Sequence, residues 1–286
     1  MSEAVGFIGL GQIGAPMASH LVGWSGGLVV CDARPEACEP FVELGATAVA
    51  TPAEVGAACG MISVMVRDDA QVWEVLEGVL TTASAGTVVA IHSTIGADTA
   101  VALAAAAATK GIALVDAPVS GGFMGASGGN LAVLVGGDEA AVERCREPFE
   151  TWAGLVVHMG PVGAGTKAKL ARNLLHFTAF TAAGEALRLA EAAGIDLRRL
   201  AKVVRHTDAI TGGPGAIMIR KTTAPIPADD GLRSIMEHTR ALGEKDLTLA
   251  LALAADLGLD LPLATLALDH LAACLGVPHD SPGADK

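Results

Sequence analysis

The chain has 286 residues, of which 51% are hydrophobic and 17% charged, and its formal net charge at pH 7 is −12. This composition is too apolar for a disordered chain, and an acidic protein without a basic face is a poor partner for nucleic acid or an anionic membrane surface. The uncharged runs are interrupted by Gly, Ser, Thr and His, and no basic segment precedes the first apolar run, so we expect neither a membrane span nor a signal peptide.

The cysteines are scattered, without the spacing of a metal site or a disulfide framework. We therefore expect free thiols, no metal site and a cytoplasmic location. They are Cys31, Cys38, Cys59, Cys145 and Cys274.

Up to about residue 158, short apolar runs alternate with helical patterns. Strands are expected at 4–9, 27–32, 61–66, 87–91, 112–117, 131–137 and 155–160, and helices at 13–24, 35–44, 69–79, 97–109 and 138–150. Strands that are apolar on both faces and separated by helices predict a parallel sheet covered on both sides. The fold class is therefore α/β, with a Rossmann-like, doubly wound sheet.

Beyond Pro161 the strand pattern stops. Residues 165–193 predict one long helix, and further helices are expected at 196–206, 212–221, 230–257 and 262–275. The sequence thus predicts a dinucleotide-binding domain over 1–161, joined by a long helix to an all-α substrate and oligomerisation domain over 162–286.

A glycine-rich turn follows the first expected strand directly and opens a helix. It consists of Gly9, Leu10, Gly11, Gln12, Ile13 and Gly14. This arrangement is typical of a turn that binds a dinucleotide pyrophosphate at a helix N-terminus. Asp32 ends the next strand, where an acid binds the ribose hydroxyls and repels a 2′-phosphate. NAD is favoured, while Arg34 leaves NADP as an alternative.

A second group of polar residues opens the long helix. Lys169 and Asn173 are four residues apart and share a face, whereas Lys167 points elsewhere. A buried lysine has a lowered pKa, which suits proton transfer beside a nicotinamide. A lysine–arginine helix end on the surface is the competing interpretation.

The segment "DAPVSGG" follows the end of another expected strand, at the sheet edge where α/β folds bind ligands. Ser120, Gly121 and Gly122 offer a hydroxyl and open backbone N–H groups, which suit a carboxylate. A plain glycine-rich hairpin is the alternative.

Together these segments resemble the β-hydroxyacid dehydrogenase family, which includes 3-hydroxyisobutyrate dehydrogenase and tartronate semialdehyde reductase. The motifs are "GFIGLGQIGAPMASHL", "HSTIGADTA", "DAPVSGG", "GPVGAGTKAKLARN" and "EKDLTLA", in this order along the chain. The resemblance implies that Lys169 is the general acid/base, that Asn173 orients the substrate, and that residues 120–122 hold its carboxylate. It also implies a homodimer or homotetramer.

The resemblance implies further cofactor contacts. These are Met65 and Val66 after the third expected strand, Ser93 and Thr94 near the nicotinamide, and Lys245 and Asp246 close to cofactor and substrate. The lysine at 169 argues against the imine-reductase branch.

Three residues depart from the family's pattern or leave a question open. Arg172 replaces the first asparagine of an "NN" pair, and His92 replaces an acid. His176 shares the face of Lys169, and packing among neighbouring aromatic residues is favoured over a role as a second acid.

The main functional hypothesis is an NAD(P)-dependent oxidoreductase that interconverts a small β-hydroxy acid and its semialdehyde or keto form. The alternatives are a reductase of imines or bulkier keto acids, and a non-catalytic nucleotide-binding protein.

Overall fold

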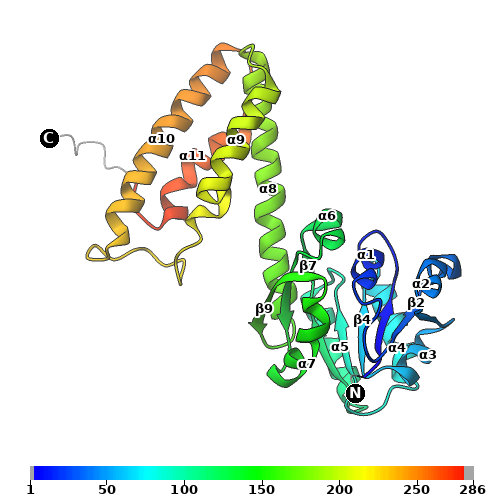
Figure 1. The fold of residues 1–286 in the computed structure, drawn as a ribbon. Helices are drawn as coiled ribbons and strands as arrows, with labels where there is room; N and C mark the ends of the chain where they lie inside the picture. Colours follow the sequence, from blue (N-terminus) through cyan, green and yellow to red (C-terminus); the bar gives the residue numbers. More distant parts are fainter. Residues whose placement is uncertain (1–2, 280–286) are drawn as a thin grey trace. The chain divides into compact units, whose positions relative to one another are not determined.

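The computed structural model describes residues 3–279, which divide into two compact units on either side of the Asn173–Leu174 bond. The first unit is built on a nine-stranded sheet with the order β3-β2-β1-β4-β5-β6-β8-β7, in which β9 also pairs with β8 (Figure 1). The strands are β1 (Val5–Ile8), β2 (Leu28–Cys31), β3 (Thr47–Ala48), β4 (Met61–Val64), β5 (Val88–Ile91), β6 (Ala113–Asp116), β7 (Val119–Ser120), β8 (Leu131–Gly136) and β9 (Ala153–Gly160).

Helices cover both faces of this sheet, as the apolar strands predict. They are α1 (Gly14–Ser19), the 3₁₀ helix η1 (Pro35–Ala37), α2 (Glu39–Glu43), α3 (Pro52–Ala58), α4 (Asp69–Leu80), α5 (Ala97–Ala108), α6 (Gly122–Ser127) and α7 (Glu139–Glu150). One buried cluster joins the sheet to α1, α6 and α7, and another joins it to α3, α4 and α5. The predicted α/β fold is confirmed.

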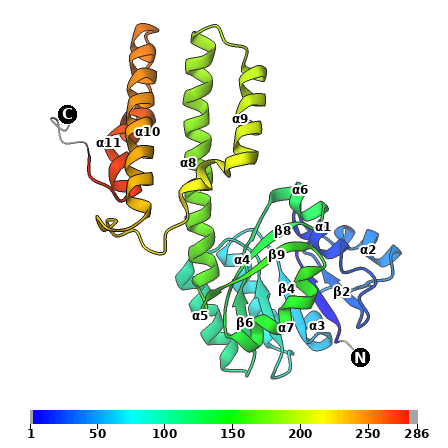
Figure 2. The same cartoon turned by 60° about the vertical axis from the view of Figure 1, so that its left-hand side comes forward.

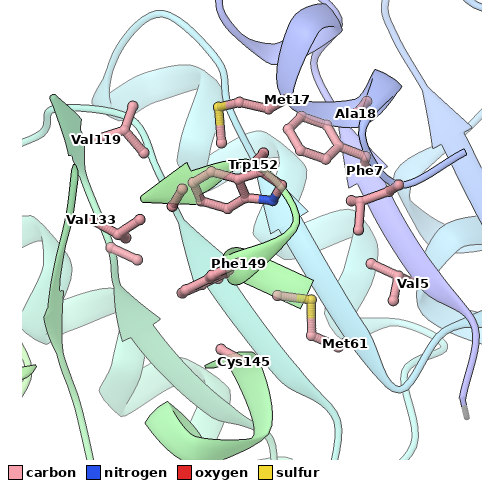
Figure 3. Close-up of a cluster of buried hydrophobic side chains, with 14 of the residues drawn as sticks. Val5, Phe7, Met17, Ala18, Met61, Val119, Val133, Cys145, Phe149 and Trp152 are labelled. Atoms are coloured by element: carbon pink, nitrogen blue, oxygen red, sulfur yellow. The ribbon is translucent and has the colours of Figure 1, made fainter. Parts of the chain in front are cut away.

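Successive side chains along a strand contribute alternately to these two clusters. In β5, Val88 and Ala90 enter the first cluster, whereas Val89 and Ile91 enter the second, because successive side chains point to opposite faces. Figure 3 shows Trp152 within the first cluster, where its ring centroid lies 5.1 Å from that of Phe149.

The sheet is parallel from β3 to β6 and then changes direction. β8 runs antiparallel to β6, and β9 returns parallel to β8 after α7. The sequence pattern did not predict this reversal, nor the short strands β3 and β7 or the helices α3 and α6. Pairing direction depends on residues distant in sequence, and β3 and β7 have only two residues each.

Two predicted helices in this unit are shorter than expected. The helix at 13–24 ends at Ser19 and continues as turns closed by i→i−3 hydrogen bonds up to Trp24. The helix at 35–44 divides into η1 and α2, and Pro40 stands in the first turn of α2, where its missing N–H has no helical partner to lose.

The second unit is helical. It contains most of α8 (Ala164–Ala192), together with α9 (Leu197–Thr211), the 3₁₀ helix η2 (Gly213–Ile217), α10 (Leu232–Asp256) and α11 (Pro262–Leu275). α10 packs along α11 (Figure 2). Glu185 of α8 accepts hydrogen bonds from the backbone N–H groups of Leu263 (2.8 Å) and Ala264 (2.9 Å) and thereby caps α11.

The prediction of a helix over 212–221 is wrong. Gly212 adopts a left-handed conformation with φ of 87° and ends α9, and only the short η2 follows. Glycine favours this termination because it has no Cβ to clash. Within residues 3–279, no helix is both long and apolar enough to cross a membrane.

Candidate functional site

A cleft of about 870 Å³ lies at the carboxyl ends of β1, β2 and β4. It is lined by many of the residues predicted to bind the cofactor: Gly9, Gly11, Gln12, Ile13, Gly14, Asp32, Arg34, Met65 and Val66. Carboxyl ends of parallel strands are the edge at which doubly wound sheets bind ligands.

The three glycines of the turn meet different surroundings. A Cβ at Gly9 would overlap the carbonyl oxygen of Met65, and one at Gly14 would overlap that of Gly9, so both positions require the absence of a side chain. A Cβ at Gly11 would meet nothing within 4 Å, so this backbone faces open space in the cleft. These surroundings fit a dinucleotide, whose pyrophosphate needs close access to the backbone.

Two backbone N–H groups hold the Asp32 carboxylate. Its Oδ2 accepts a hydrogen bond from the Leu10 N–H at 2.7 Å, and its Oδ1 accepts one from the Arg34 N–H at 2.9 Å. The Arg34 Nε lies 3.4 Å from the same Oδ1. Leu10 thus contributes through its backbone, and the carboxylate is oriented before any ligand binds.

Several lining residues were missed by the sequence reasoning, namely Ala50, Pro52, Gln71, Glu74 and Val75. Local signals for some of them exist. Thr51 and Glu54 form a capping box that starts α3 beside Pro52, and Asp68 caps α4 by accepting from the Gln71 N–H at 3.0 Å.

The Ser93 hydroxyl forms hydrogen bonds with the backbone of Val66. Its Oγ donates to the carbonyl oxygen of Val66 at 2.7 Å and accepts from the Val66 N–H at 2.9 Å. The hydroxyl therefore positions the cleft residue Val66, whereas the next residue, Thr94, is exposed.

Asp116 joins the sheet to the long helix, a role that sequence reasoning did not find. It is fully buried at the end of β6, where its Oδ1 accepts from the Gly163 N–H at 2.7 Å and its Oδ2 from the Thr166 N–H at 2.6 Å. Burial raises the pKa of this carboxyl, while the two N–H donors act in the opposite direction. The start of α8 is thereby anchored at the edge of the sheet.

The predicted carboxylate-binding residues follow Asp116 closely. Ser120 lies in β7, opposite Ala132 of β8, and Gly121 and Gly122 are exposed at the start of α6. The same strand end therefore leads into this loop and anchors α8.

Lys169 lies one turn beyond Thr166 on α8 and is only 7% exposed. Burial, and secondly the neighbouring Arg172 guanidinium, lower the pKa of Lys169 from 10.5 to about 8. Lys167 is exposed, as its position on the helix predicts. The Arg172 Nη1 donates to the Asn173 Oδ1 at 3.4 Å, and both of these side chains are half-buried.

His92 is a structural residue. It is 1% exposed, its Nδ1 lies 2.8 Å from the Ala117 carbonyl oxygen, and its Nε2 lies 3.0 Å from the Ser63 Oγ. Burial lowers the pKa of His92 to about 4, so the ring is neutral at physiological pH.

The remaining residues of interest belong to the second unit. The Lys245 Nζ and Asp246 Oδ1 of α10 form an exposed ion pair at 2.7 Å. The His176 ring packs against Phe177 and Phe180, with centroids 5.3 and 4.2 Å away. Over residues 3–279 no group of three or more His, Cys, Asp or Glu side chains is arranged to hold a metal ion.

Family models match both halves of the chain. Residues 4–160 match the NAD-binding domain of 6-phosphogluconate dehydrogenase, and residues 163–281 match the NAD-binding model of NADP-dependent 3-hydroxyisobutyrate dehydrogenase.

Individual proteins are similar over almost the full length. An uncharacterised oxidoreductase of Mycobacterium tuberculosis is 58% identical, covering 96% of this chain and 94% of its own. The crystal structure of a candidate oxidoreductase from Mycobacterium avium has a TM-score of 0.92 at 53% identity, covering 96% of this chain and 99% of that one. The structure of Mycobacterium tuberculosis 3-hydroxyisobutyrate dehydrogenase with L-serine has a TM-score of 0.67 at 32% identity, with coverages of 95% and 93%.

Proposed function

The chain belongs to the β-hydroxyacid dehydrogenase family, and on this premise we propose that it interconverts a small β-hydroxy acid and its semialdehyde or keto form. The observation that carries the proposal is Lys169. It is a nearly buried lysine whose pKa is lowered to about 8, on a helix anchored at the strand end that leads into the Ser120–Gly122 loop. A lysine with such a pKa exchanges protons near neutral pH.

The cofactor is a nicotinamide dinucleotide, and we propose NAD rather than NADP. Gly9, Gly11 and Gly14 leave the backbone open to the pyrophosphate, and the oriented Asp32 carboxylate suits the ribose hydroxyls and repels a 2′-phosphate. Arg34 forms an ion pair with Asp32, and this pairing weakens the attraction of the Arg34 guanidinium for a phosphate. When bound, the cofactor supplies or accepts the hydride.

The chain's own residues then have distinct tasks. The backbone N–H groups of Gly121 and Gly122 and the Ser120 hydroxyl hold the substrate carboxylate. In oxidation, neutral Lys169 accepts the proton of the substrate hydroxyl, and in reduction its ammonium group donates that proton to the carbonyl oxygen. Asn173 orients the substrate through its amide. General acid–base catalysis of this kind contributes about 10²–10⁴-fold to the rate.

The family and one relative support the proposed substrate class. The 32% identical dehydrogenase was solved with L-serine, which is itself a β-hydroxy acid. Lys169 also argues against imine reduction, because the imine-reductase branch resembles this family but usually lacks a lysine at this position.

We propose that residues 1–161 bind the dinucleotide and that residues 162–286, including Lys245 and Asp246, contribute to the substrate site and to a homodimer or homotetramer. Large exposed apolar side chains in the second unit support the oligomer, because monomers rarely leave so many uncovered. Examples are Leu174 (72%), Phe177 (60%), Met218 (73%) and Leu249 (62%). A cytoplasmic location is part of the same proposal.

Nicotinamide absorbance tests the function. Wild type and Lys169→Ala are assayed with NAD⁺ and with NADP⁺ on 3-hydroxyisobutyrate, 3-hydroxypropionate, glycerate, serine and 4-hydroxybutyrate. Turnover by wild type that falls at least about 10²-fold in the variant, with NAD⁺ binding unchanged, supports the proposal. Cofactor binding without turnover of any substrate would favour a non-catalytic protein, and full activity of the variant would remove Lys169 from the mechanism.

A further inference from the structure

The N-terminal part of α8 has an unusual charge pattern for this protein. Between Ala164 and Gly184 it carries Lys167, Lys169 and Arg172 and no acidic residue, although the whole chain has a net charge of −12. Lys167 is exposed to solvent, but Lys169 is nearly buried and Arg172 is half-buried. Water therefore does not screen the inner two cations as it screens the outer one.

Within residues 3–173, the described part of the first unit, neither Lys169 nor Arg172 forms an ion pair with a carboxylate. The nearby Asp116 uses both carboxylate oxygens to accept hydrogen bonds from backbone N–H groups. The hydrogen bond that Arg172 does make is long and goes to the neutral Asn173 amide. Arg172 has five N–H donors, so most of its capacity remains open.

This arrangement is unfavourable unless an anion binds. Lys169 and Arg172 are three residues apart, which places them about 4.5 Å apart along the helix axis and about 60° apart around it. Like charges at this spacing repel. A negative group between or beside them would relieve this repulsion.

One carboxylate of the substrate is already provided for by the Ser120–Gly122 loop, and Lys169 faces the reacting oxygen. Arg172 is a separate cation one turn further along. We propose that Arg172 binds a second anionic group of the substrate, so that the site selects β-hydroxy acids that carry two acidic groups, such as dicarboxylates. This inference rests on the proposed function and narrows its substrate class.

The same contact gives Arg172 a second task in recognition. Because its Nη1 donates to the Asn173 Oδ1, one of the two acceptor positions of that amide oxygen is engaged, and the NH₂ group supplies the donors of Asn173. Asn173 then acts toward the substrate as a donor, which matches an anionic or carbonyl group.

A matched pair of substrates tests the proposal. 2-(Hydroxymethyl)succinate is 3-hydroxyisobutyrate with one methyl hydrogen replaced by a carboxylate, so the reacting alcohol is the same in both. Four proteins are compared: wild type, Arg172→Asn, Arg172→Lys and the control Lys167→Asn. The control removes one positive charge from the exposed side of the helix. We measure kcat/KM for both substrates and confirm folding by circular dichroism.

We expect wild type to prefer the dicarboxylate, and Arg172→Asn to reduce that preference by roughly 10- to 100-fold, the range for one hydrogen bond to a charged group. Arg172→Lys should keep part of the preference, and Lys167→Asn should keep all of it. A wild-type enzyme that prefers the monocarboxylate overturns the inference, and so does an Arg172→Asn variant that loses activity equally on both substrates.

Binding of non-reactive analogues separates this inference from the proposed function. Calorimetry of methylsuccinate and isobutyrate is performed on NAD⁺-loaded wild type and Arg172→Asn. Tighter binding of methylsuccinate that depends on Arg172 supports the inference even if no alcohol is oxidised, in which case the dehydrogenase proposal alone fails. If Arg172→Asn instead weakens the binding of NAD⁺ and leaves the ratio of the affinities for the two acids unchanged, Arg172 contributes to cofactor binding and the inference is wrong.

Discussion

Replacing Lys169 with methionine should abolish activity and at the same time stabilise the protein. In the folded chain the pKa of Lys169 falls from 10.5 to about 8, chiefly because burial disfavours the ammonium form. At about 1.4 kcal/mol per pKa unit, keeping this lysine protonated at pH 7 costs roughly 3 kcal/mol of folding free energy. Methionine has a similar length and no charge, so Lys169→Met removes that cost.

The sign of the pH dependence follows from the same pKa values. Between pH 8 and 10.5 the unfolded chain holds a proton that the folded chain has released, so the stability of wild type rises with pH over this range. The advantage of Lys169→Met should therefore be about 3 kcal/mol at pH 7 and only about 1 kcal/mol at pH 9.5.

Urea unfolding followed by tryptophan fluorescence measures this difference, because Trp24, Trp73 and Trp152 all lie in the same unit as Lys169. Lys167→Met is the control, since the exposed Lys167 should change stability by less than about 0.5 kcal/mol. A Lys169→Met variant that is no more stable than wild type at pH 7, or whose advantage does not change with pH, would refute the reasoning. In wild type the rate of alcohol oxidation should rise with pH around an apparent pKa of about 8.

Three further predictions concern the cleft and the anchor of α8. Gly11→Ala should keep its thermal stability yet bind NAD⁺ roughly tenfold more weakly, as calorimetry would show, whereas Gly14→Ala should unfold more readily by about 1–3 kcal/mol because its Cβ overlaps the Gly9 carbonyl. Asp32→Asn should weaken the binding of NAD⁺ and reduce the preference for NAD⁺ over NADP⁺, measured as the ratio of their dissociation constants. Asp116→Ala should lose about 1–3 kcal/mol of unfolding free energy, because two buried N–H groups lose their acceptor; unchanged stability would contradict the anchoring role.

Local patterns were sufficient for the glycine-rich turn after β1 and for most of the sheet. The spacing of Gly9, Gly11 and Gly14 after an apolar strand, and the acid at Asp32, reflect contacts between residues that are adjacent in sequence or joined by neighbouring strands. Apolar runs on both faces of a strand likewise predict burial before any partner is known. The same reasoning failed at 212–221, where helical composition was outweighed by the left-handed conformation of Gly212.

The sequence by itself therefore determined the α/β class, the position of the glycine-rich turn and the helical spacing of Lys169 and Asn173. Only the tertiary structure decided that β8 runs antiparallel to β6, that Ser93 holds Val66, and that Asp116 binds N–H groups 47 and 50 residues further along the chain. Periodicity and glycine spacing are local properties, readable from a short segment. The burial and the partner of a charged group depend on which distant segments fold against it, and these set the pKa of Lys169 and, within residues 3–173, leave Arg172 without a carboxylate partner.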